Sequence, residues 1–88
     1  MIEKTIAAAA NMEARSAALF VQAASKFRST VKIRAEDKII NAKSIMGVMS
    51  LGILNGHILS VIAEGEDAAQ AVDTLLKFLS KEENLYAI

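Results

Sequence analysis

The sequence predicts a small α+β domain in which amphipathic helices cover one face of an antiparallel sheet. Residues 14–27 and 68–79 carry apolar side chains at the helical spacing of three and four. Residues 31–36 alternate apolar and charged side chains, and residues 58–63 form a short apolar run after a turn, so both segments are expected to be strands. From residue 14 onward the resulting order is helix, strand, strand, short helix, strand, helix, which is typical of an α+β fold.

The first half of the chain begins with an ambiguous segment. Alanine is the best helix former, so residues 5–10 taken alone favour a helix. The next segment is clearer, because its apolar residues build one helical stripe made of Ala17, Phe20, Val21, Ala24 and Phe27. After it, Val31, Ile33 and Ala35 alternate with charged residues, which predicts a half-buried strand.

The middle of the chain reads as a strand, a short helix and another strand. Asp37 and Lys38 are expected to turn the chain into a returning strand over residues 39–42, and residues 44–50 are expected to form a short helix. Asn55-Gly56 is a turn, since both residues tolerate positive φ. The strand that follows is apolar enough to be covered on both faces, or nearly so.

The last helix is predicted after Gly65-Glu66-Asp67, where two carboxylates favour the positive end of the helix dipole. Lys77 and Lys81 lie near its end, where positive charge is favoured. Residues 82–84 make a polar exit, and residues 85–88 are an apolar tail to which no element is assigned. The buried stripe of this helix is expected to comprise Ala68, Val72, Leu75, Leu76 and Leu79.

Composition restricts the classes of protein to consider. A chain of 88 residues makes a single domain, residues 1–88, with no room for a second core. Its 10 basic and 10 acidic residues cancel, so gross charge favours neither nucleic acid nor an anionic membrane as a partner. Cysteine is absent, the opening residues are too weakly apolar for a signal peptide, and no run approaches the ~20 apolar residues of a membrane span. We expect a soluble cytoplasmic protein.

The most informative segment is Asn41–Met46 followed by Gly47–Gly52. Ser44 lies where a strand gives way to the short helix, the position of an N-cap. Apolar side chains at helical spacing are usually core, but if these are exposed they form a docking surface with a modifiable hydroxyl at its edge. The clustered apolar side chains are Ile45, Met46 and Met49, and Gly47 between them adds no side chain of its own.

This segment resembles the serine-site region of HPr, the histidine-containing phosphocarrier of the bacterial sugar phosphotransferase system. The segments Ala17–Ala23 and Ala63–Asp67 add to the similarity, which extends from about Met12 to Leu79. The chain is most similar to the catabolite-repression branch of the family in Gram-positive bacteria, and that branch lacks the active-site histidine. The resemblance implies an HPr-like open-faced sandwich, in which three helices lie on one face of a four-stranded antiparallel sheet and the chain opens with a strand rather than a helix.

The phosphohistidine of HPr has no equivalent here. In the family it lies in a Gly-Leu-His-x-Arg-Pro segment that opens the first helix, and the resemblance places Glu13 at the histidine, Arg15 at the arginine and Ser16 at the proline. A glutamate could form an acyl phosphate, but it is also an ordinary carboxylate favoured by the helix dipole. His57 is expected to be a solvent-side strand residue. We therefore expect no phosphorelay through histidine.

The resemblance implies a regulatory protein rather than an enzyme. Ser44 would be phosphorylated by the bifunctional HPr kinase/phosphorylase, and a LacI-type catabolite control repressor would bind the product. No catalytic constellation or metal-binding spacing is present, and no cofactor is expected. The residues expected to contact these partners are Arg15, Lys43, Ile45, Met46 and Met49.

Two alternatives remain open. One is a diverged phosphocarrier that uses Glu13 or an external residue. The other is an interaction module in which Ser44 is only a cap and the apolar cluster binds a protein constitutively. Relatives can exchange their first strand, so the resemblance also leaves a homodimer open.

Overall fold

The computed structural model describes residues 1–80. Lys81, the polar exit at 82–84 and the tail at 85–88 therefore lie outside the described residues. Along the chain the elements are β1 (Ile2–Ala7), α1 (Ala14–Ser25), β2 (Thr30–Ala35), β3 (Lys38–Asn41), α2 (Ile45–Ser50), β4 (Ile58–Glu64) and α3 (Ala68–Ser80). This is the predicted order.

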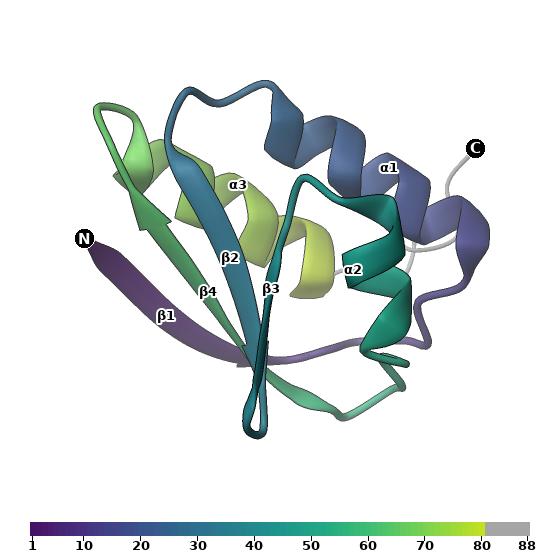
Figure 1. The fold of residues 1–88 in the computed structure, drawn as a ribbon. Coiled ribbons are helices and arrows are strands. Elements are labelled where there is room, and N and C mark those ends of the chain that lie inside the picture. Colours follow the sequence, from purple (N-terminus) through teal and green to yellow (C-terminus); the bar gives the residue numbers. More distant parts are fainter. Residues whose placement is uncertain (81–88) are drawn as a thin grey trace.

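The four strands form one antiparallel sheet in the order β1-β4-β2-β3. The three helices lie on one side of it and leave the other side open (Figure 1). The helix α3 packs against β1 and β4, and α1 packs against α2 and α3. The predicted α+β open-faced sandwich is confirmed.

The opening strand is confirmed as well, and the alanine run does not continue as a helix. The strand β1 pairs with β4 from Ile2↔Ala63 to Ala7↔Ile58. Ala8 and Ala10 are buried in the segment that follows, and the Ala9 amide donates to the Leu79 carbonyl at 3.0 Å. Tertiary hydrogen bonds and burial thus outweigh the helix propensity of alanine here.

The prediction that residues 58–63 are covered on both faces is wrong. In β4 every second side chain is buried, while Ile58 is 58% exposed. The register sets Val61 opposite Ile33, and both point to the helices. Because the three described helices lie on one side of the sheet, none of them covers the other face of β4.

The core lies between the sheet and the helices. Phe20 of α1 meets Phe78 of α3 edge to face, with ring centroids 5.6 Å apart. The predicted stripe of α3 is buried except for Leu76, which is only partly covered. The helix α1 ends at Ser25, so Phe27, which packs partly against the core, lies beyond the helix rather than within it.

The Asp67 carboxylate does not serve its own helix alone, as the sequence suggested, but joins two turns. It accepts hydrogen bonds from the Arg28 amide and the Ser29 amide at 2.9 Å each, and from the Ser29 hydroxyl at 2.5 Å. These bonds, led by the hydroxyl, lower the pKa of Asp67 to about 2. The turn before β2 is thereby fixed to the start of α3.

Candidate functional site

Ser44 is the N-cap of α2, as predicted. Its backbone is extended, with φ −109° and ψ 117°, and its Oγ accepts a hydrogen bond from the Gly47 amide at 3.1 Å. The preceding turn is held by Asn41, whose Oδ1 accepts from the Lys43 amide at 2.9 Å and whose carbonyl accepts from the Ser44 amide at 3.1 Å. The turn presents a half-buried hydroxyl in a fixed position.

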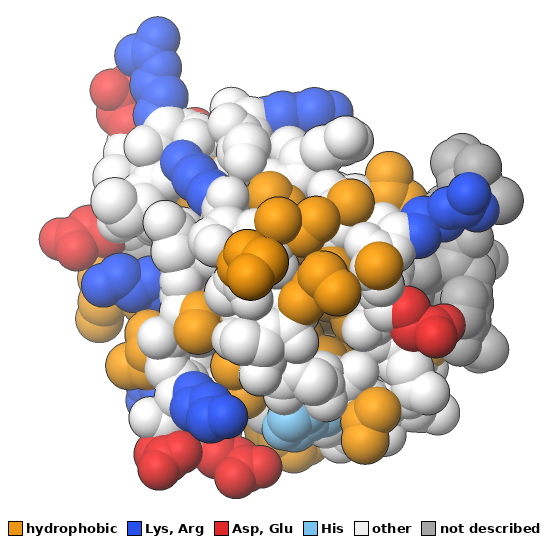
Figure 2. Space-filling model, turned by 45° about the vertical axis from the view of Figure 1, so that its right-hand side comes forward, with side chains coloured by type: hydrophobic (Ala, Val, Ile, Leu, Met, Phe, Trp, Pro, Cys, Tyr) orange, Lys and Arg blue, Asp and Glu red, His pale blue; other side chains and the backbone are white. Residues whose placement is uncertain are grey.

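The apolar side chains of α2 face solvent. Met46 is 77% exposed, Met49 48% and Ile45 42%, whereas Val48 is buried and anchors the helix to the core. We call Ile45, Met46 and Met49 the α2 patch; Figure 2 shows hydrophobic side chains gathered on this face of the molecule. The reading of these residues as core is therefore wrong, and the exposure required of a docking surface is present.

Gly47 lies where α2 approaches both β3 and Ser44. A Cβ at this position would stand 3.4 Å from the Cβ of Ile40 in β3 and 3.4 Å from both Cβ and Oγ of Ser44. These are ordinary van der Waals distances, so the structure has room for a methyl group here. With glycine, the space beside the Ser44 hydroxyl is left free of a side chain from this position.

The two expected cations of the site differ in their surroundings. The Lys43 ammonium donates to the Phe27 carbonyl at 2.7 Å, so it ties the turn before α2 to the chain leaving α1. Arg15 is exposed in the first turn of α1, the helix that packs on α2. Within residues 1–80 the guanidinium of Arg15 has no ion-pair partner. Arg15 is thus the more exposed of the two cations.

Glu13 is exposed at the N-cap of α1, one position before the first turn. Ser16, only 2% exposed, fastens this end of the helix: its Oγ accepts from the Glu13 amide at 2.9 Å and donates to the Glu13 carbonyl at 3.1 Å. The serine at the expected proline position thus stabilises the helix start through its hydroxyl.

The segment before Glu13 is bonded to the chain that leaves α2. The Met12 amide donates to the Ile53 carbonyl at 2.9 Å, and Asn11 Oδ1 accepts from the Asn55 amide at 2.8 Å. Glu13 therefore lies near the C-terminal end of α2, while Ser44 lies at its N-terminal end. The sequence identified the turn at Asn55 but not its partner Asn11, because nothing local relates residues so far apart.

His57 is not a strand residue, contrary to the prediction. It directly precedes β4 and is half-buried, and its Nε2 lies 3.7 Å from Oε1 of Glu36 in the β2–β3 turn. Glu36 adopts φ 57°, a left-handed conformation that the tight turn requires. Both residues belong to the hairpin end of the sheet.

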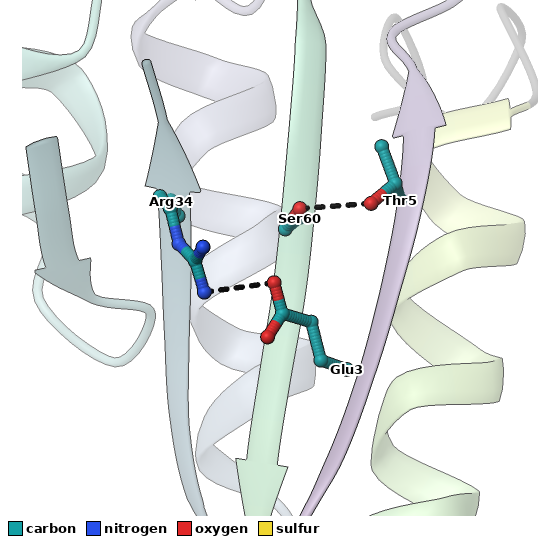
Figure 3. A network of polar contacts seen from close by, with 4 residues as sticks. All are labelled: Glu3, Thr5, Arg34 and Ser60. Carbon is teal, nitrogen blue, oxygen red and sulfur yellow. Dashed lines mark hydrogen bonds and ion pairs between the residues drawn. The ribbon is translucent and has the colours of Figure 1, made fainter. Parts of the chain in front are cut away.

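The open face of the sheet carries polar contacts that hold β1 in place (Figure 3). Glu3 of β1 reaches across β4 to Arg34 of β2, with Oε2 and Nη2 2.8 Å apart, and Thr5 is bonded to Ser60 at 2.9 Å. Neither contact gathers groups suited to catalysis. Among residues 1–80 no three His, Cys, Asp or Glu side chains cluster to hold a metal ion. No helix in the same range is long and apolar enough to cross a membrane.

Comparison with known proteins gives concordant matches. The family model described as the phosphorylation site of the HPr component of the phosphotransferase system matches residues 2–81. The HPr-like protein Crh of Halalkalibacterium halodurans is 44% identical in an alignment of 84 residues, and the match covers 93% of this chain and 100% of that protein.

Solved structures agree. The crystal structure of HPr-C-His from Thermoanaerobacter tengcongensis superposes with a TM-score of 0.88 at 41% identity, covering 100% of this chain and 99% of the other. The crystal structure of Crh from Bacillus subtilis, described as a dimer with a swapping domain, gives 0.76 at 40% identity, covering 93% of this chain and 92% of that one.

Proposed function

Because this chain belongs to the HPr family of the phosphotransferase system, we propose that it is a Crh-like regulatory protein of carbon catabolite repression. In this proposal Ser44 is phosphorylated reversibly, and the phosphorylated form is the cofactor of a transcriptional regulator. The observation that carries the proposal is the Ser44 hydroxyl at the edge of the exposed α2 patch.

The chemistry of the switch follows from the position of the hydroxyl. A phosphate adds about two negative charges and three acceptor oxygens. At an N-cap these oxygens can accept from the same backbone amide that Ser44 Oγ now engages, so the fold need not change. The surface does change, because a dianion appears beside the α2 patch. A regulator would pair basic residues with the phosphate and cover the patch with apolar side chains.

The proposal includes no phosphohistidine and no enzymatic activity. The alternative, a diverged phosphocarrier, is supported by the exposure of Glu13 at the histidine position. Incubation with phosphoenolpyruvate and the first enzyme of the relay distinguishes the two, because only a carrier becomes labelled. We expect no label on this chain.

A homodimer is part of the proposal as well. Among the described strands, β1 lies at an edge of the sheet and pairs only with β4, so it can be exchanged with a second copy without loss of the other strand pairs. The Bacillus subtilis relative described as a swapped dimer supports this possibility. Light scattering on the purified protein would detect the dimer.

The test of the main proposal is mass spectrometry after incubation with ATP and an HPr kinase/phosphorylase. We expect one added phosphate on the wild type, none on Ser44→Ala and one on Ser50→Ala. Ser50 is the matched control, because its hydroxyl lies on the same helix and donates to the Gly47 carbonyl at 2.6 Å. An unmodified wild type would shift support to the constitutive interaction module.

Binding of the regulator is a separate step. After kinase treatment, the wild type is expected to bind a LacI-type catabolite control repressor, and Ser44→Ala is expected to lose that binding. Equal binding by both proteins would rule out Ser44 as the switch. Because Met46 is also expected to contact the kinase, Met46→Lys is first taken to complete phosphorylation with excess kinase; the phosphorylated variant should then lose repressor binding, since the patch supplies apolar contact.

A further inference from the structure

We propose that the free edge of β3 is an interaction surface for a second copy of this chain, which adds its own β3 antiparallel to it and joins the two sheets into one. The contact is symmetric, because the same strand of both copies meets itself across a two-fold axis. It goes beyond the proposed function, since it requires neither phosphate on Ser44 nor the exchange of β1.

The strand β3 ends the described sheet on the side opposite β1 (Figure 1). Natural edge strands are commonly protected by charged side chains, by proline or by a bulge. This chain contains no proline, and β3 pairs with β2 without a bulge over all four of its residues. Its only charged residue is Lys38 at its start, and the next residue, Ile39, is 55% exposed. The edge is therefore weakly protected.

The register identifies the backbone groups that face outward from β3. The Ala42 amide donates to the Val31 carbonyl at 2.9 Å, so this pair and every second pair along the two strands are the hydrogen-bonded ones. Ile40 is then bonded to β2, whereas the amide and carbonyl of Ile39 point to the free edge, as does the amide of Asn41. A further strand can bond here without displacing an existing strand pair.

A two-fold axis at Ile39 uses these outward groups. The Ile39 amide of each copy donates to the Ile39 carbonyl of the other, and two residues along, the Asn41 amide meets the Asp37 carbonyl of the second copy. Ile39 lies opposite Arg34, whose side chain is on the open face of the sheet (Figure 3). The two exposed isoleucines therefore meet on that face as a cross-strand pair.

The charges near the two ends of β3 are complementary. The acidic turn Glu36-Asp37 precedes the strand, while Lys32 and Lys43 line one hollow beside its other end, together with Asn41. Antiparallel pairing brings the acidic turn of each copy against the lysines of the other, so opposite charges meet at both ends of the contact. Parallel pairing would set like charges side by side. The charge pattern thus favours a second copy in the antiparallel orientation.

The contact is short, and this sets its strength. The four residues of β3 span about 14 Å, at about 3.4 Å per residue. An edge of this length buries less than the roughly 1,200 Å² at which specific, stable interfaces begin. We therefore expect a weak dimer, with a dissociation constant of about 0.1 mM, that separates on dilution.

Sedimentation equilibrium and amide hydrogen exchange on the full chain, from about 10 μM to about 1 mM, test the proposal. The mean mass should rise with concentration, and the amides of Ile39 and Asn41 should exchange more slowly as the dimer forms. Ile39→Lys places like charges opposite each other on the axis and should weaken the dimer at least about ten-fold. Ile58→Lys is the matched control and should leave the dimer unchanged, because Ile58 is 58% exposed but lies in the inner strand β4.

A charge exchange tests the orientation of the two copies. Lys32→Glu and Asp37→Lys should each weaken the dimer about three-fold to ten-fold, and the double variant should restore it, because opposite charges then meet again. Ser44→Ala should dimerise like the wild type, so failure of the proposed function and failure of this interface are distinguishable.

Three results would overturn the proposal. The first is a wild type that stays monomeric at about 1 mM. The second is a dimer that persists in Ile39→Lys, because exchange of β1 would then account for it. The third is slow exchange of the Ile39 amide in a monomer, because another part of the same chain, such as residues 81–88, would then cover the edge. A dimer lost in Ile39→Lys and kept in Ile58→Lys supports it.

Discussion

Replacing Gly65 by alanine should be among the most damaging single-methyl additions to this protein. Gly65 joins β4 to α3 with φ 144°, a conformation that side-chain-bearing residues rarely adopt. A Cβ would lie 2.7 Å from Ser29 Oγ and 2.8 Å from Ser29 Cα. The second of these atoms belongs to the backbone, so it cannot rotate away.

The two effects add. A residue in such a backbone region costs about 1–3 kcal/mol, and overpacking by one methyl costs about 1–3 kcal/mol more. The clash also pushes Ser29 away from Asp67, which accepts two of its hydrogen bonds. We expect Gly65→Ala to lower the free energy of unfolding by about 2–6 kcal/mol, a large part of the 5–15 kcal/mol of an ordinary domain.

Urea unfolding followed by circular dichroism measures this change. Gly52→Ala is the matched control, because Gly52 also has positive φ, at 58°, but a Cβ there meets nothing within 4 Å. It should cost only the left-handed backbone term, about 1–2 kcal/mol. If Gly65→Ala is no less stable than Gly52→Ala, the close approach to Ser29 does not limit the fold and the reasoning fails.

Two further predictions concern polar groups. Ser44→Ala removes the N-cap of α2 and should cost about 1 kcal/mol, which lowers the melting temperature by about 4–8 °C, while Ser44→Asp keeps an acceptor and loses less. Because folding lowers the pKa of Asp67 from 3.8 to about 2, its carboxylate contributes stability above pH 3.8, and this contribution disappears as the pH falls towards 2. Asp67→Asn should therefore be less stable than the wild type at neutral pH, and the difference should shrink over that range in urea titrations; a constant difference would contradict the assignment.

Periodicity predicted most of the fold because each helix and strand buries one face. The stripes in α1 and α3 and the alternation in β2 are local patterns, and the structure confirms them. Periodicity did not indicate that β4 is covered on one face only, since its outward residues include Ile58 and Ile62. Isoleucine is favoured on strands through its β-branched shape as well as through burial, so the sequence overstated the coverage.

The candidate site was predicted in part. Ser44 as a cap followed from its residue type and from the helix that begins after it. Whether Ile45, Met46 and Met49 are core or surface did not follow, because helical spacing marks an apolar face without stating what covers it. The engagement of Lys43 by the Phe27 carbonyl could not be foreseen either, since the two residues meet only when α1 and the turn before α2 come together.

The sequence by itself determined the order of elements, the cap at Ser44 and the absence of histidine from the start of α1, because these depend on residue types and on patterns within one turn or strand. Only the tertiary structure decided that the alanine run after β1 forms no helix, that the α2 patch faces solvent and that Glu13 and Ser44 lie near opposite ends of one helix. These features depend on contacts between segments far apart in the chain, such as Met12 with Ile53. Burial and hydrogen bonding at such contacts outweigh the fractions of a kilocalorie by which local propensities differ.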